Sequence, residues 1–236
     1  MDGQELQGRY YPAAVNPAPV IVLMHWANGD QDDWVEVGYW LQNRGLGGKS
    51  AKDYPWLDPS WFPALAEGES YAVFTFNFRG CKGGCNLYSP EPWLLDAEAA
   101  MKAVIALEGV DPTRVLVAGA SIGADGAADG CMFLNAKSGT NGKCLGAFSF
   151  SPGDYLTLPF AAVVNEVEAM TPPAAVYCLY GEDDNPSAKI CKSAKGNLYQ
   201  KFGWKGNDHG MMLIRPDMEP LSLQIFLDFI RDRFRR

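Results

Sequence analysis

Histidine is scarce in this sequence: only His25 and His209 occur among 236 residues. Two imidazoles and a single close cysteine pair, in the stretch CKGGC, do not supply the ligand spacings of a zinc site, so we expect no metal. The 20 lysines and arginines are outnumbered by 28 acidic residues, which argues against a nucleic-acid partner. No apolar run approaches the about 20 residues that span a bilayer, so we expect no membrane span.

A secretion signal is also missing, because the opening MDGQELQGRYYP has no basic segment followed by an apolar one. We therefore expect either a cytoplasmic protein or a mature chain from which a signal has been removed. The one basic run, residues 231–236, ends an expected amphipathic helix. Cations at that end of a helix complement its dipole, so we interpret the run as a solvated terminus.

Cysteine, in contrast, is present in an even number. The spacing suggests three sequential disulfides, Cys81–Cys85, Cys131–Cys144 and Cys178–Cys191. Six free thiols, some of them buried as small apolar groups, are the alternative. We favour disulfides and, with them, an oxidising compartment, so that the protein would be extracytoplasmic or secreted.

Strand-like and helix-like segments alternate, which predicts an α/β fold with a mostly parallel central sheet flanked by helices. The length and the 47% apolar content fit one domain over residues 1–236. The expected strands lie within 5–12, 18–26, 71–80, 114–121, 144–154, 174–184 and 197–210, and the expected helices within 89–112, 122–136 and 220–234. Residues 32–61, rich in Trp and Tyr, should begin as a helix and continue as an ordered loop. That loop either shapes a binding site or is held to the core by its tryptophans.

Ser121 lies between two glycines, where a buried strand ends and a small-residue helix begins, in RVLVAGASIGADGAADG. In a Gly-x-Ser-x-Gly turn the serine adopts a strained conformation that turns its Oγ outward, and the glycines let strand and helix approach closely. The first helical amides are free, so the backbone N–H of Ile122 would be one oxyanion donor. The alternative is a structural turn in which Ser121 caps the helix.

A serine nucleophile needs a base, and a carboxylate must orient that base. His209 follows the last expected strand and should therefore lie on the same sheet edge as Ser121. Asp184, which follows the preceding strand, is the first candidate for the acid, Asp183 is the second and Asp154 is the third.

The chain order Ser121, Asp184, His209 resembles that of the α/β-hydrolase family. The resemblance covers about residues 20–234 and rests on HWANGD, FNFRGCKGG, GASIG, GEDD and DHG, which occur in that order. It implies the family's fold and a serine hydrolase without a metal or organic cofactor. It also implies that the Arg-Gly turn in FNFRGCKGG is structural.

The resemblance further implies a second oxyanion donor just after the strand in residues 18–26. This donor would be the backbone N–H of Ala27 or of Trp26, with His25 supporting the loop. Trp26 stands where the family usually has glycine, which leaves the exact donor open and should narrow the acyl pocket.

By resemblance, a serine at the nucleophile position disfavours the cysteine dienelactone hydrolases and the aspartate dehalogenases and epoxide hydrolases. The short layout with a simple elbow still looks closest to the dienelactone-hydrolase-like enzymes and small serine carboxylesterases. Residues 155–173, where many relatives insert a lid, leave room for only a loop and one short helix, so we expect no large cap. The expected reaction is two-step hydrolysis of carboxylic esters that have short acyl groups or are displayed on a polymer. A peptidase or amidase on the same fold, or a non-catalytic binding module, are the alternatives. The sequence leaves acyl length and oligomeric state open.

Overall fold

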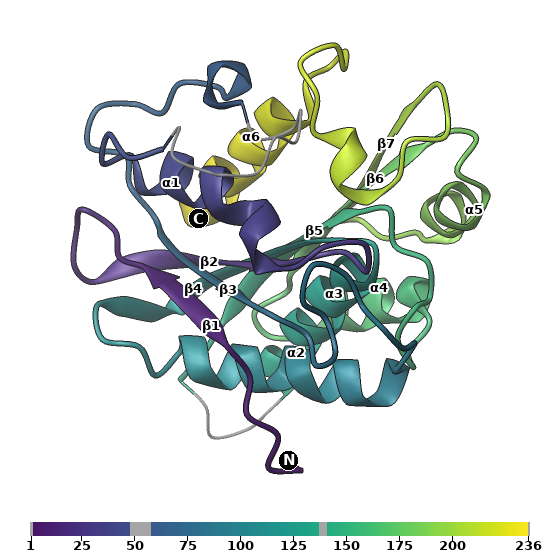
Figure 1. Cartoon of the computed structure of the whole chain (residues 1–236), viewed down its shortest axis with the longest axis horizontal. Helices are drawn as coiled ribbons and strands as arrows, with labels where there is room; N and C mark the ends of the chain where they lie inside the picture. Colours follow the sequence, from purple (N-terminus) through teal and green to yellow (C-terminus); the bar gives the residue numbers. More distant parts are fainter. Residues whose placement is uncertain (1, 48–57, 137–140, 236) are drawn as a thin grey trace.

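A seven-stranded sheet forms the centre of the computed structural model, which describes residues 2–47, 58–136 and 141–235 (Figure 1). Its strand order is β1-β3-β2-β4-β5-β6-β7. The strands are β1 (Gly8–Tyr11), β2 (Ala18–Met24), β3 (Ala72–Phe76), β4 (Val110–Ala120), β5 (Cys144–Phe150), β6 (Ala175–Gly181) and β7 (Tyr199–Trp204). β1 pairs antiparallel with β3, and the other neighbouring strands are parallel, as the alternating sequence pattern predicted.

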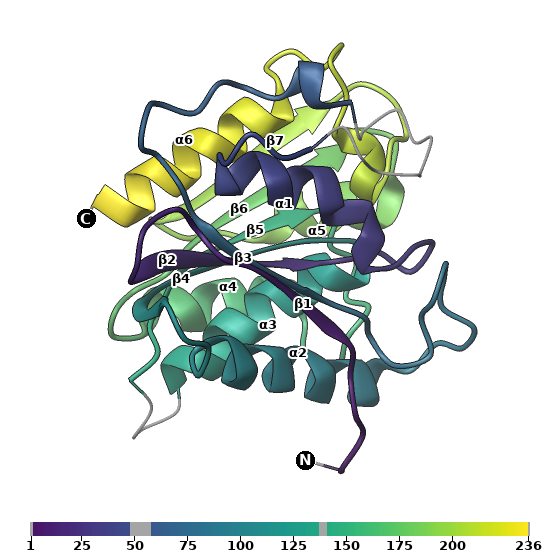
Figure 2. The same cartoon turned by 60° about the vertical axis from the view of Figure 1, so that its left-hand side comes forward.

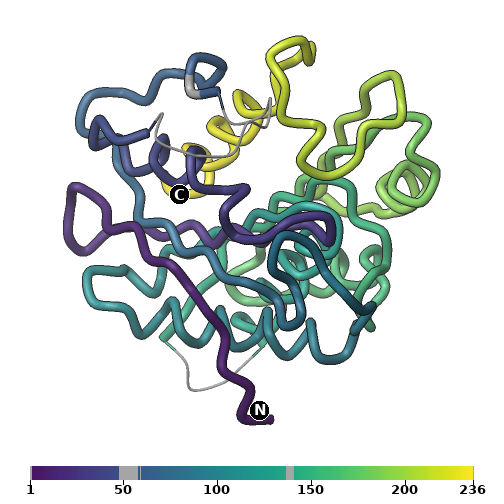
Figure 3. The backbone as a smooth tube through the Cα atoms, in the orientation of Figure 1, coloured from purple at the N-terminus to yellow at the C-terminus, as the bar shows by residue number. Residues whose placement is uncertain are grey.

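Helices cover both faces of this sheet, with α1 and α6 on one side and α2, α3 and α4 on the other (Figure 2). Figure 3 traces the same path along the backbone. The helices are α1 (Val35–Gln42), α2 (Pro90–Val104), α3 (Ile122–Ala136), α4 (Phe160–Ala169), α5 (Asn185–Ser193) and α6 (Ser222–Arg235), and the 3₁₀ turns are η1 (Gln31–Trp34), η3 (Pro59–Trp61) and η4 (Gly210–Leu213). No described helix has both the length and the apolar character needed to cross a bilayer.

The central strands are buried on both faces, which explains their unbroken apolar runs. In β2, Val20 and Val22 pack into the core under α2 and α3, whereas Ile21 and Leu23 pack into the core under α1 and α6. All four side chains are fully buried, and each such burial stabilises the fold by about 1.5–3 kcal/mol. This double core holds the carboxyl ends of the parallel strands in fixed positions.

All three disulfides suggested by the spacing are present, namely Cys81–Cys85, Cys131–Cys144 and Cys178–Cys191. The first closes a short loop after β3, the second joins α3 to the start of β5, and the third joins β6 to α5. Two of the three therefore tie a helix to the sheet.

The segment between β5 and β6 contains only loop and the short helix α4, so the described chain has no large cap. Residues 31–42 form η1 and α1, which confirms the helix expected at the start of the aromatic segment. Residues 48–57, in the remainder of that segment, lie outside the described part of the chain.

The basic C-terminal run differs from the expected solvated terminus. Arg231 donates two hydrogen bonds, of 2.8 and 2.6 Å, to the carboxylate of Glu69, and Arg233 is only 7% exposed. The Arg231 guanidinium holds the pKa of Glu69 down at about 2. These contacts fasten α6 to the loop before β3, and the sequence did not reveal them because the two partners lie 162 positions apart.

Candidate active site

Ser121 occupies a sharp turn between β4 and α3, with φ 54°, in the left-handed region that costs energy for a side chain other than glycine. Its amide donates to the Phe150 carbonyl at 2.8 Å, which fixes the turn to β5. A Cβ added at Gly119 would overlap the carbonyl oxygen of Gly123, and one added at Gly123 would overlap that of Met24. The close approach of strand and helix therefore requires both glycines, as the sequence pattern indicated.

His209 and Asp184 are brought together across 25 positions of sequence. Nδ1 of His209 lies 2.7 Å from Oδ2 of Asp184. A carboxylate can only accept, so Nδ1 carries the proton and Nε2 is left as the basic nitrogen. Asp184 also occupies the N-cap of α5, but its side chain makes no capping bond there and serves the imidazole instead.

The residue after His209 shows how this loop reaches Ser121. Gly210 donates its amide to Oγ of Ser151 at 2.9 Å, just beyond β5. A Cβ built on Gly210 would lie 3.8 Å from Cβ of Ser121. The His209 loop therefore runs directly beside Ser121, on the edge where the parallel strands end.

The other two candidate acids have different environments. Asp183 is exposed, and its amide is bonded to the Gly206 carbonyl at 2.9 Å. Asp154 is also exposed, and its carboxylate accepts the Phe160 amide at 2.7 Å, where the chain enters α4. Among the described residues, the carboxylate bonded to His209 is that of Asp184.

The turn after β2 is held by the second histidine. Phe78 donates its amide to Nε2 of His25 at 3.0 Å, so the proton of His25 is on Nδ1 and is donated to the Trp26 carbonyl at 2.7 Å. In a trans peptide the N–H of Ala27 points opposite to that carbonyl, so His25 sets the direction of the Ala27 amide. The Ala27 carbonyl in turn accepts the Cys85 amide at 2.8 Å.

Ile122 and Trp26 are the remaining residues of the expected oxyanion hole. Ile122 is the first residue of α3, where helix geometry leaves the amide without an intrahelical partner. The Trp26 indole donates to Asp33 Oδ2 at 2.9 Å and is 9% exposed, so its side chain is anchored against η1. This anchored ring also packs against the His209 loop: a Cβ built on Gly210 would lie 3.1 Å from Cε3 of Trp26.

The Arg-Gly turn after β3 is structural, as the resemblance implied. Arg79 donates to Oδ1 of Asp96 through Nε at 2.8 Å and through a terminal nitrogen at 2.6 Å, and its amide donates to Oδ2. Asp96 is fully buried in α2. This ion pair locks the turn to the helix layer.

Two residues at the site were missed by sequence reasoning, Tyr155 and Asp125. The Tyr155 ring meets the His209 ring edge to face, with centroids 6.1 Å apart. Asp125 lies one turn beyond Ser121 in α3 and accepts hydrogen bonds from the loop that contains Tyr155. One signal was available, because SPGDY directly follows an expected strand and so belongs to the same sheet edge as Ser121.

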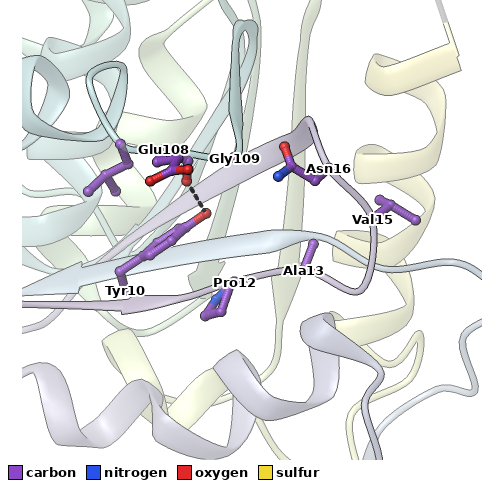
Figure 4. Close-up of a pocket in the computed structure, with 8 residues that line it drawn as sticks. Tyr10, Pro12, Ala13, Val15, Asn16, Glu108 and Gly109 are labelled. Carbon is purple, nitrogen blue, oxygen red and sulfur yellow. Dashed lines mark hydrogen bonds between the residues drawn. The ribbon is translucent and has the colours of Figure 1, made fainter.

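One hollow lies away from these residues. It has a volume of about 450 Å³ and lies between the turn after β1 and the turn after α2 (Figure 4). Tyr10 donates its hydroxyl to the Glu108 carbonyl across it, at 3.2 Å. None of the residues discussed above as catalytic candidates lines it. The described residues also contain no group of three potential metal ligands.

The sequence matches no protein-family model and no curated protein. Its structure is similar to that of esterase 2 from Thermogutta terrifontis, with a TM-score of 0.63 and 17% identity over 98% of this chain and 91% of the other. It is also similar to a protein of unknown function from Agrobacterium tumefaciens assigned to the α/β hydrolases, with a TM-score of 0.60 and 20% identity over 98% and 92%. A third match is 2,6-dihydroxy-pseudo-oxynicotine hydrolase, with a TM-score of 0.64 and 14% identity over 99% and 66%. The chain has the α/β-hydrolase fold.

Proposed function

We propose that this chain is a serine hydrolase that cleaves carboxylic esters through an acyl-enzyme. The observation that supports this most directly is the 2.7 Å contact between His209 and Asp184 in a loop that runs beside Ser121. Nucleophile, acid and base follow one another in the chain order of the fold's serine enzymes. The strained turn at Ser121 gives the conformation that such a nucleophile needs.

The reaction begins when Nε2 of His209 removes the proton from Oγ of Ser121 as Oγ attacks the ester carbonyl carbon. The carbonyl π electrons move onto oxygen, and the amides of Ile122 and Ala27 donate to that oxyanion. The tetrahedral intermediate then collapses, the bond to the alcohol oxygen breaks, and His209 delivers its proton to the leaving alcohol. Water repeats the sequence on the acyl-enzyme, releases the acid and restores Ser121. Asp184 stabilises the imidazolium in both halves.

Small or polymer-borne esters fit the short segment between β5 and β6, which builds no large cap over the site. Structures of esterase 2 from Thermogutta terrifontis have butyrate or propionate bound, and we propose that this chain accepts acyl groups of similar length. The three disulfides support an extracytoplasmic location, where an ester displayed on a polymer would be accessible.

The test is labelling with a fluorophosphonate, read by intact mass and peptide mapping without reductant. We expect one adduct on Ser121 and three intact disulfides in the same spectra. Ser121→Ala should be unlabelled and should lose several orders of magnitude in kcat on short-chain esters while keeping its melting temperature. A panel of matched esters and amides then separates an esterase from an amidase. Folded wild-type protein that is neither labelled nor active would refute the proposal and favour a binding module.

A further inference from the structure

Tyr155 presents a hydroxyl to the reacting centre from the loop after β5. Burial, followed by the charges of Asp184 and Asp125, raises the pKa of this phenol to about 12. The hydroxyls of Ser121 and Ser187 act on it in the opposite direction. The Ser187 hydroxyl is fully buried and makes no hydrogen bond of regular geometry with a described residue. The phenol therefore keeps its proton at neutral pH and can donate a hydrogen bond.

The loop holds Tyr155 at several points. Its amide and that of Gly153 donate to Oδ2 of Asp125, at 3.0 and 3.2 Å. Its carbonyl accepts the Tyr88 hydroxyl at 2.8 Å. Its ring folds back over Gly153 so closely that a Cβ there would overlap it. Backbone, ring and carbonyl are thus all constrained, so the hydroxyl is preorganised.

Asp125 is the origin of this constraint, and it belongs to the nucleophile's own helix. Its carboxyl is buried, with Oδ2 on the two loop amides and Oδ1 without a partner among the described residues. Because α3 starts directly after Ser121, the first turn of one helix fixes both the nucleophile and the loop that contains Tyr155. A rigid link of this kind keeps Ser121 and Tyr155 at a fixed position relative to each other.

An ester has two oxygen atoms at the reacting carbon, and in the proposed site different groups donate to each of them. The carbonyl oxygen is accounted for by the amides of Ile122 and Ala27. The alkoxy oxygen must receive its proton from His209, and the Tyr155 ring packs against the His209 ring. A phenol at this position is suited to hold the alkoxy oxygen.

We propose that Tyr155 donates a hydrogen bond to the leaving alkoxy oxygen of the bound ester, and that Asp125 is the positioning residue that places it. This inference rests on the serine-hydrolase function proposed above. The donated bond stabilises negative charge as the bond from the carbonyl carbon to the alkoxy oxygen breaks, before the proton from His209 arrives. Help of this kind matters most for a poor leaving group such as an alkyl alcohol, and least for a nitrophenol.

The experiment compares two esters of one acid, ethyl butyrate and 4-nitrophenyl butyrate, in wild type and Tyr155→Phe. We expect kcat/KM to fall about tenfold for the ethyl ester and by less than about threefold for the nitrophenyl ester. Tyr10→Phe removes a hydroxyl in the distant hollow of Figure 4 and should match wild type on both esters. Equal losses on the two esters, or no loss on either, would overturn the role of Tyr155.

Fluorophosphonate labelling separates this inference from the function on which it rests. If Ser121 is labelled in wild type and in Tyr155→Phe, a missing leaving-group effect refutes only the role of Tyr155. If wild type is neither labelled nor active, both proposals fail.

Asp125→Ala should reproduce the leaving-group effect of Tyr155→Phe, and Asp125→Asn, which keeps an acceptor oxygen, should recover most of the loss. The double variant Asp125→Ala with Tyr155→Phe should fall no further than Asp125→Ala alone. Multiplied losses in the double variant would show that Asp125 does not act through Tyr155. If Asp125→Ala does not fold, two other variants still test the proposal. Tyr155→Phe removes one oxygen atom and tests the role of the phenol, and Asp125→Asn should keep a ratio of ethyl-ester to nitrophenyl-ester activity close to that of wild type.

Discussion

Replacing Asp129 by asparagine should change how the stability of this protein depends on pH. Asp129 lies in α3, is 2% exposed, and its Oδ2 has no hydrogen-bond partner among the described residues. Burial, followed by the nearby carboxyls of Asp125, Asp154 and Glu98, raises its pKa from 3.8 to about 8. The group is therefore protonated in the folded protein at a pH at which it is ionised in the unfolded chain.

The sign follows from proton binding. Between the two pKa values the folded state binds one more proton than the unfolded state, so the free energy of unfolding falls as pH rises. Asp129 alone contributes a slope of about −1.4 kcal/mol per pH unit in the middle of that interval. Its stabilising contribution is fully present below the unfolded pKa and is lost as pH rises to about 8. Asparagine does not titrate, so this contribution disappears in the variant.

The assay is urea unfolding with disulfides intact, followed by circular dichroism near pH 5, 6 and 7. We expect the slope of the variant to be shallower than that of wild type by about 1.4 kcal/mol per pH unit, with unchanged m-values. Asp228→Asn, at an exposed position of α6, is the matched control and should keep the wild-type slope. Parallel curves for wild type and Asp129→Asn would show that the carboxyl does not titrate in this interval and would refute the reasoning.

Two further changes test the acid and the cross-links. Asp184→Asn should lower kcat on a short ester by about 10⁴-fold, because the imidazole of His209 loses its orienting carboxylate. Asp183→Asn is the control and should leave kcat near the wild-type value. Similar losses in the two variants would contradict the assignment of Asp184 as the acid. Replacing Cys131 and Cys144 together by alanine should lower the free energy of unfolding by about 3 kcal/mol in urea, since their disulfide closes a loop of 13 positions. An unchanged free energy of unfolding in the double variant would show that this disulfide does not stabilise the fold by restricting the unfolded chain.

The parts of the structure that sequence predicted well are those set by local pattern. Apolar runs marked the buried strands, and the limits of α3 were predicted at residues 122–136, because the turn at Ser121 demands glycines on both sides. The α5 helix was not expected, since its nine residues are mostly polar and only one side contributes to the core. Its presence matters, because it makes Asp184 the residue at which β6 passes into a helix.

Other features depend on partners that are distant in sequence. Asp183 and Asp184 are adjacent and chemically identical, and only the turn after β6 decides which carboxylate meets His209. Tyr155 looked like an ordinary loop residue until the packing of its ring against His209 was known. The sequence indicated only that SPGDY follows a strand at the same sheet edge, so Asp184 was predicted as the first of three candidate acids and the role of the phenol was not predicted.

The buried imidazole of His25 has a consequence for spectroscopy. Both of its ring nitrogens are engaged, one accepting from the Phe78 amide and the other donating to the Trp26 carbonyl, and the residue is fully buried. The ring is therefore held in one tautomer, with the proton on Nδ1. His209, 28% exposed at its side chain, is the only other histidine in the sequence. In a nitrogen-15 spectrum of the two histidines, His25 should therefore show a protonated Nδ1, because two backbone groups hold its ring in that tautomer.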